Sequence, residues 1–180
     1  METTDTTSNP DGLRRSAIDR SVKGPVMYLF ASAALWLLAA TILGLLSTIK
    51  LYSPEFLNIS YLNYARVQPA HLNALVYGWA MQGAFGVMIW LAARRSGREL
   101  RNGRAALIIA VIFWNVGITL GVLGILAGDS TSRQWLEFPH YVWPLLIIAF
   151  LIVAYRVLAF FIRAERKGGF MITSWYILAA

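Results

Sequence analysis

His71 is the residue of this sequence whose type and position most suggest chemistry. It opens a long apolar, glycine-punctuated segment within the run YLNYARVQPAHLNALVYGWAMQGAFG at residues 61–86. A neutral imidazole near one end of a membrane helix suggests an axial ligand of a heme iron. Residues three, four and seven positions apart share one helix face, which here holds Ala74, Leu75, Gly78, Gln82, Phe85 and Gly86. Because several of these are small, a flat macrocycle could lie close to the backbone.

Position alone leaves other interpretations of the two histidines open. His71 could instead bond a backbone carbonyl or interfacial water, or contact a proton or a quinone. His140, in the run FPHYVWP, is typical of an interfacial histidine, although it shares with His71 an expected place near the outer end of a segment. Such a shared depth is what a heme or metal site requires. Two histidines are too few for a self-contained zinc or copper centre.

Three charged side chains are weaker candidates. Arg66 lies five residues before His71 and could pair with a carboxylate such as a heme propionate, or anchor the chain at the membrane interface. Glu137, in the run WLEFP, could contact a cation or another subunit, or lie in solvent. Arg156 is expected to snorkel toward the cytoplasmic face. Three uncharged polar residues are expected to form interhelical hydrogen bonds: Gln82, Asn115 and Thr119.

The composition predicts an integral membrane protein that positions these residues on helices. Of 180 residues, 58% are hydrophobic and 14% are charged, against about 25% charged in a soluble domain. Four stretches are long enough to span a bilayer as helix: residues 26–49, 69–93, 105–127 and 142–162. We therefore expect an all-α, polytopic transmembrane bundle. There is no cysteine, which excludes disulfides, iron–sulfur ligation and thiolate-bound zinc in this sequence.

A fifth apolar stretch begins near residue 170, so we expect four full spans and the start of a fifth, in an N-terminal piece of a longer chain. The glycines of the spans predict close helix packing in lipid. For Gly117, Gly121 and Gly124, helix packing is the only expected role. Gly78, Gly83 and Gly86 have a second use, which is to make room beside His71.

The basic residues mark topology and do not indicate a nucleic-acid partner, although the net charge is +7. Three groups flank what would be one side of the membrane: Arg14, Arg15, Arg20 and Lys23; Arg94, Arg95, Arg98, Arg101 and Arg104; Arg163, Arg166 and Lys167. The other side holds only Lys50, Arg66 and Arg133. Cytoplasmic loops attract the basic residues, so the N-terminus is expected inside. Residues 1–24 are expected to form a flexible polar tail and residues 25–180 the membrane domain.

The string Arg66-Val67-Gln68-Pro69-Ala70-His71, continuing to Gly78, resembles the second-helix motif of subunit I in heme-copper oxidases. It is closest to the C family, the cbb-type cytochrome c oxidases, and is similar to nitric oxide reductases. The resemblance implies that His71 is an axial ligand of low-spin heme b, that Arg66 lies near its propionates and that Gly78 packs beside it. Gln68 stands where the C family often has a second arginine, which implies different propionate pairing.

The segment around Glu137 is similar to one whose glutamate helps to hold a calcium ion beside the propionates. In this family the second axial histidine comes from the tenth helix. Later helices supply the ligands of the heme-copper centre. The resemblance therefore implies that this sequence carries part of the low-spin heme site and no complete catalytic centre.

The resemblance implies the N-terminal part of the catalytic subunit of a respiratory terminal oxidase in a bacterial inner membrane. Such an enzyme passes electrons from a cytochrome c-type or quinol donor through heme b to the heme-copper centre. There it reduces dioxygen to water with proton translocation, together with other oxidase subunits. This piece alone is expected to be inactive. The alternatives are a nitric oxide reductase-like subunit, a small electron-transfer subunit with one heme between His71 and His140, and a cofactor-free membrane scaffold.

Overall fold

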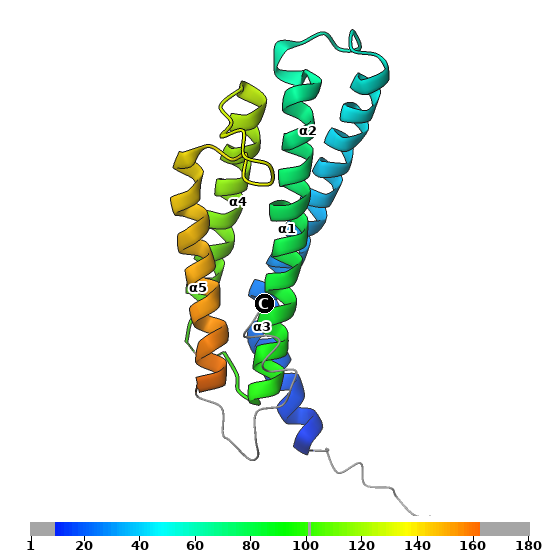
Figure 1. Cartoon of the computed structure of the whole chain (residues 1–180). Coiled ribbons are helices and arrows are strands. Elements are labelled where there is room, and N and C mark those ends of the chain that lie inside the picture. The colour runs from blue at the N-terminus through cyan, green and yellow to red at the C-terminus, as the bar shows by residue number, and fades with distance from the viewer. Residues whose placement is uncertain (1–9, 101, 163–180) are drawn as a thin grey trace, which may run out of the picture.

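Four long helices form the part of the chain that the structure, a computed structural model, describes, namely residues 10–100 and 102–162 (Figure 1). The elements in chain order are α1 (Pro10–Tyr52), η1 (Ser60–Leu62), α2 (Tyr64–Asn73), η2 (Ala74–Ala80), α3 (Met81–Ser96), α4 (Arg104–Ala127), η3 (His140–Val142) and α5 (Trp143–Ile162). α2, η2 and α3 are continuous, and η2 is a π-helical stretch. No strand occurs within these two ranges, which confirms the all-α prediction.

Each long helix is apolar and long enough to cross a bilayer: Pro10–Tyr52, Tyr64–Ser96, Arg104–Ala127 and His140–Ile162. This confirms the four predicted spans. The second span begins at Tyr64, five residues earlier than expected, because Asn63 caps it. The side-chain oxygen of Asn63 accepts the backbone N–H of Arg66 at 3.1 Å. Arg66 therefore lies in the first turn of a helix. The start of a fifth span, from residue 170, lies outside the described residues.

The helices pack through small residues and present large apolar side chains outward. α1 packs against α2, η2, α3 and α4, and α5 packs against α3 and α4. A Cβ atom on Gly117 would lie 2.7 Å from Leu146 of α5, and one on Gly121 would lie 2.4 Å from Phe138. These contacts confirm the packing prediction for α4, since small residues let helices approach closely in lipid. Exposed leucines and isoleucines such as Leu35, Leu38 and Ile42 are available to face lipid.

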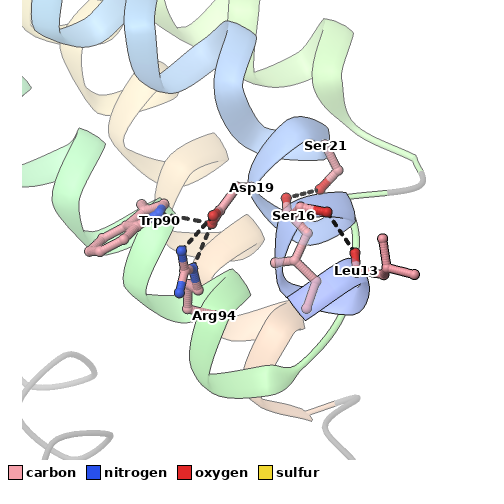
Figure 2. Close-up of polar contacts among 7 residues, drawn as sticks. Leu13, Ser16, Asp19, Ser21, Trp90 and Arg94 are labelled. Carbon is pink, nitrogen blue, oxygen red and sulfur yellow. Dashed lines mark hydrogen bonds and ion pairs between the residues drawn. The ribbon is translucent and has the colours of Figure 1, made fainter. Parts of the chain in front are cut away.

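The expected flexible tail is wrong for residues 10–24, which form the first turns of α1 and dock on α3 (Figure 2). Asp19 accepts hydrogen bonds from Arg94 and from the Trp90 indole N–H. Ile18 and Val22 are buried beside this polar contact. The segment is helical because two apolar residues four positions apart share a face that the bundle covers.

The connection between α4 and α5, residues 128–139, folds back into one end of the bundle. In Figure 1 it is the yellow loop that dips between α4 and α2. Phe138 is fully buried, with its ring 5.2 Å from that of Tyr77. The Tyr77 hydroxyl donates to the Trp135 carbonyl at 2.7 Å. The loop thus brings its neighbour Glu137 onto the helix that carries His71.

Candidate functional site

His71 lies near the end of α2 and is held by α1. Its Nδ1 is 2.7 Å from the Ala40 carbonyl oxygen. Because a carbonyl only accepts, Nδ1 donates, and in the neutral imidazole Nε2 then keeps its lone pair. Nε2 makes no hydrogen bond with another described residue. Metal-ligating histidines are oriented in this way, with one ring nitrogen donating to a backbone carbonyl while the other binds the metal.

Gly44 of α1 is required for this position of the ring. A Cβ atom on Gly44 would lie 2.7 Å from Cε1 and 2.9 Å from Nδ1 of His71, which is closer than real Cβ contacts come. The imidazole thus lies against bare backbone. Sequence reasoning missed Gly44. The available signal was the pair of small residues at positions 40 and 44, a spacing that places both on one helix face.

The predicted face of small residues does turn toward α1 together with His71, but side chains of α1 fill it. A Cβ atom on Gly78 would lie 2.7 Å from Trp36, and one on Gly86 would lie 3.0 Å from Phe30. Gly83 faces open space. Helix packing against Trp36 therefore explains why position 78 holds a glycine. The role of Gly78 beside a heme stays a prediction.

Arg66 points away from His71 and toward the end of α4. Its Nη1 donates to the Leu126 carbonyl at 3.1 Å, where the last carbonyls of a helix lack partners. Gly128 follows with φ +98°, and a Cβ atom there would lie 2.7 Å from Arg66 Nη2. The hydrogen bonds of Arg66 and His71 thus go to different helices. Arg66 instead lines a cavity with another predicted site residue, Glu137.

Arg66 and Glu137 line one open cavity of about 590 Å³, together with Gln68, Gly128, Ser130 and Ser132. The Glu137 side chain is buried, and its Oε2 accepts the Asn73 side-chain N–H at 2.6 Å. The same amide nitrogen donates to the Pro69 carbonyl at 2.8 Å. Asn73 Oδ1 is buried and has no partner among the described residues. The buried oxygens of Glu137 and Asn73 thus join the α4–α5 connection to the helix segment that carries His71.

The two histidines lie in different parts of the bundle. His140 is exposed at the start of η3 and lines a cavity of about 290 Å³ with Thr131, Arg133, Leu136 and Trp143, whereas His71 packs on α1. Among residues 10–100 and 102–162 there is no group of three or more histidine, cysteine or acidic side chains suited to a metal ion. The described geometry gives no support to a heme held between His71 and His140.

The prediction of interhelical hydrogen bonds is confirmed for Gln82 and Asn115 and is wrong for Thr119. Gln82 is fully buried and exchanges hydrogen bonds with Asn115 of α4 and Ser32 of α1. Asn115 Oδ1 also accepts the Trp36 indole N–H at 2.9 Å. Thr119 donates to a carbonyl of its own helix. The Gln82 network ties α1, α3 and α4 together below the level of His71, where the bilayer offers no water as a partner.

The comparison with known families covers most of the chain. Residues 24–180 match the family described as "Cytochrome C and Quinol oxidase polypeptide I". The chain belongs to this family. Polypeptide I, or subunit I, is thus the part of such an oxidase to which this sequence corresponds, and the match begins two residues before the first predicted span. The predicted heme-copper oxidase resemblance is confirmed at this level. The narrower assignment to the C family stays a prediction.

One curated relative extends the comparison. The "Cytochrome c oxidase subunit 1 homolog" of Agrobacterium tumefaciens (strain T37) is 24% identical over 177 residues, which is 96% of this chain and 31% of the relative. The chain thus spans about a third of that subunit I relative. No solved structure matches the chain.

Proposed function

We propose that this chain is the N-terminal part of the catalytic subunit of a respiratory terminal oxidase and that His71 is an axial ligand of its low-spin heme b. The observation that carries the proposal is the 2.7 Å contact between His71 Nδ1 and the Ala40 carbonyl. In the neutral imidazole, this contact leaves the lone pair of Nε2 available for iron. The membership in the oxidase subunit I family supports the assignment.

The residues present fit a heme at this end of the bundle. His71 would bind the iron, and the guanidinium of Arg66 would pair with a propionate. When bound, the heme supplies one-electron redox chemistry. The chain's own contribution is to fix the imidazole through Ala40 and Gly44 and to exclude water with the packed residues around Phe138. Gly78, whose present contact is with Trp36, is proposed to pack beside the heme.

Glu137 is proposed to serve a calcium ion in the propionate region. Calcium takes six to eight oxygen ligands. Glu137 offers a buried carboxylate, and Asn73 Oδ1 is a buried oxygen without a partner among the described residues. A complete site would need further oxygens from the heme propionates or the backbone. The two side chains thus fit one side of such a site.

The wider function follows the family. In the full-length enzyme, electrons from a cytochrome c-type or quinol donor would pass through heme b to a heme-copper centre that reduces dioxygen, with proton translocation. The other oxidase subunits would surround this helical bundle in a bacterial inner membrane. The N-terminus and the docked start of α1 would lie in the cytoplasm, as the distribution of basic residues indicates.

The test is a reduced-minus-oxidised visible spectrum of the full-length protein in membranes, with His71→Ala and, as control, His140→Ala. We expect His71→Ala to abolish the low-spin b-type α band, because an axial ligand is lost. The control should keep the band, since His140 is exposed at the start of η3. An unchanged band in His71→Ala would refute the assignment.

A further inference from the structure

A smaller cavity lies at the end of the bundle opposite to His71, between the α3–α4 connection and α5. Its volume is about 230 Å³, and its lining includes Arg98, Glu99, Asn102, Arg156 and Phe160. Two guanidinium groups thus meet an apolar helix surface. We propose that this cavity binds the phosphate of an anionic phospholipid headgroup.

Arg156 is the central residue of the cavity. It lies six residues before the end of α5, about 9 Å along the helix axis, so its charge starts within an apolar segment. Its Nη1 donates to the Asn102 carbonyl at 2.8 Å, which confirms that it reaches toward the expected inner end. Its Nε is buried and has no acceptor among the described residues. A charged donor group in this state gains from a nearby anion.

The backbone is shaped around this guanidinium. Gly103 has φ +130°, and a Cβ atom there would lie 2.4 Å from Cζ and Nη1 of Arg156. Only glycine allows the connection to pass so close in this conformation. The position of Arg156 is therefore built into the fold. Snorkelling alone, which needs only a route to water, does not require such a close approach.

The charges of the cavity favour an anion. Arg98 is exposed and forms no hydrogen bond or ion pair with another residue of the described ranges. Glu99 also lines the cavity and opposes an anion, which leaves one excess positive charge in the lining. A phosphate between the two arginines would accept charge-assisted hydrogen bonds from both.

The surroundings favour a lipid phosphate over free phosphate. Phe160 and Ala159 of α5, with Leu100 of the connection, form the apolar part of the lining. Ile162, three residues after Ala159 and so on a neighbouring part of the helix surface, is exposed and offers a surface for an acyl chain. Basic pockets between membrane helices on the cytoplasmic side suit anionic headgroups, and the basic residues indicate that this end faces that leaflet.

The test uses the full-length protein in nanodiscs of phosphatidylcholine with a minority of phosphatidylglycerol. Native mass spectrometry then measures how much phosphatidylglycerol stays bound. Arg156→Gln and Arg98→Gln should each weaken retention about fivefold, the value of one arginine near an anionic headgroup. Arg20→Gln is the matched control, because it removes an exposed cation from the same end without touching the cavity. It should leave retention unchanged.

Two results would overturn the proposal. In the first, Arg98→Gln and Arg156→Gln retain as much phosphatidylglycerol as Arg20→Gln. In the second, inorganic phosphate at the lipid's concentration displaces it fully, which would identify a free-phosphate site. If Arg156→Gln fails to fold, Arg98→Gln decides alone, because its side chain is exposed and its loss leaves the helices intact.

Discussion

Replacing Gly44 with alanine tests whether α1 holds His71 in the geometry of a ligand. The new Cβ atom would lie 2.7 Å from Cε1 and 2.9 Å from Nδ1 of His71. Carbon atoms pack best at about 3.5 Å or more, so the ring must retreat by about 0.8 Å or the helices must separate. Overpacking of this kind costs about 1–3 kcal/mol.

The retreat also stretches the bond from Nδ1 to the Ala40 carbonyl, which is 2.7 Å long in the structure. An increase of about 0.8 Å carries that bond past the hydrogen-bond range. Loss of such an outer-shell partner typically costs about 10–100-fold in metal affinity or activity. We therefore expect Gly44→Ala to lower the heme b content of the full-length protein and to broaden or shift the signals of its low-spin ferric heme.

The assay is heme b per protein by pyridine hemochrome, combined with low-temperature electron paramagnetic resonance, whose g-values respond to the orientation of an axial imidazole. Gly83→Ala is the matched control. It adds the same methyl group to a membrane helix, at a point where the new Cβ atom would meet no described residue within 4 Å apart from its own helix backbone and chain neighbours. If Gly44→Ala kept the heme content and g-values of the parent protein, the proposed support of His71 by α1 would be wrong.

Two further predictions concern stability. Asn73→Ala removes the 2.6 Å donor to buried Glu137 and should destabilise the protein by about 1–3 kcal/mol in thermal unfolding. The double variant Asn73→Ala/Glu137→Ala should lose less stability than the sum of the losses in the two single variants. Strict additivity of these losses would show that the pair is not coupled. Asp19→Asn weakens the ion pair between Asp19 and Arg94. Both side chains are 36% exposed, so the loss of stability should be about 0.2–1 kcal/mol. High salt should shrink the difference between Asp19→Asn and the parent, and a salt-independent difference would contradict an ionic origin.

The fold followed from the sequence because lipid imposes one strong rule. Backbone groups must be satisfied within each apolar segment, so long apolar runs become helices. The ends of the helices were harder to predict. Tyr64 starts α2 because Asn63 caps it, and the sequence before Pro69 reads as an interfacial loop. Likewise Ile18 and Val22 are two apolar residues in a polar stretch, and only the packed bundle shows that they are buried.

The sequence pointed to the candidate residues of the site, but it did not reveal most of the contacts between them. His71 stood out because an imidazole in an apolar segment is rare. The contact with Gly44 was not visible, because it joins residues 27 positions apart on two helices and depends on how α1 crosses α2. Asn73 carried no role in the sequence-based interpretation. Its bond to Glu137 depends on the turn of the 128–139 connection, which apolar periodicity does not encode.

The contact between Arg66 and α4 bears on the role that the family resemblance implies for it. Five residues along a helix turn the side chain by about 140°, so Arg66 and His71 cannot share a face. The guanidinium carries five N–H donors, and the structure uses one of them at the Leu126 carbonyl. Arg66 also lines the cavity that Glu137 lines. The cap on α4 therefore leaves Arg66 with donors that could bind a propionate, and the proposed pairing does not require the cap to break.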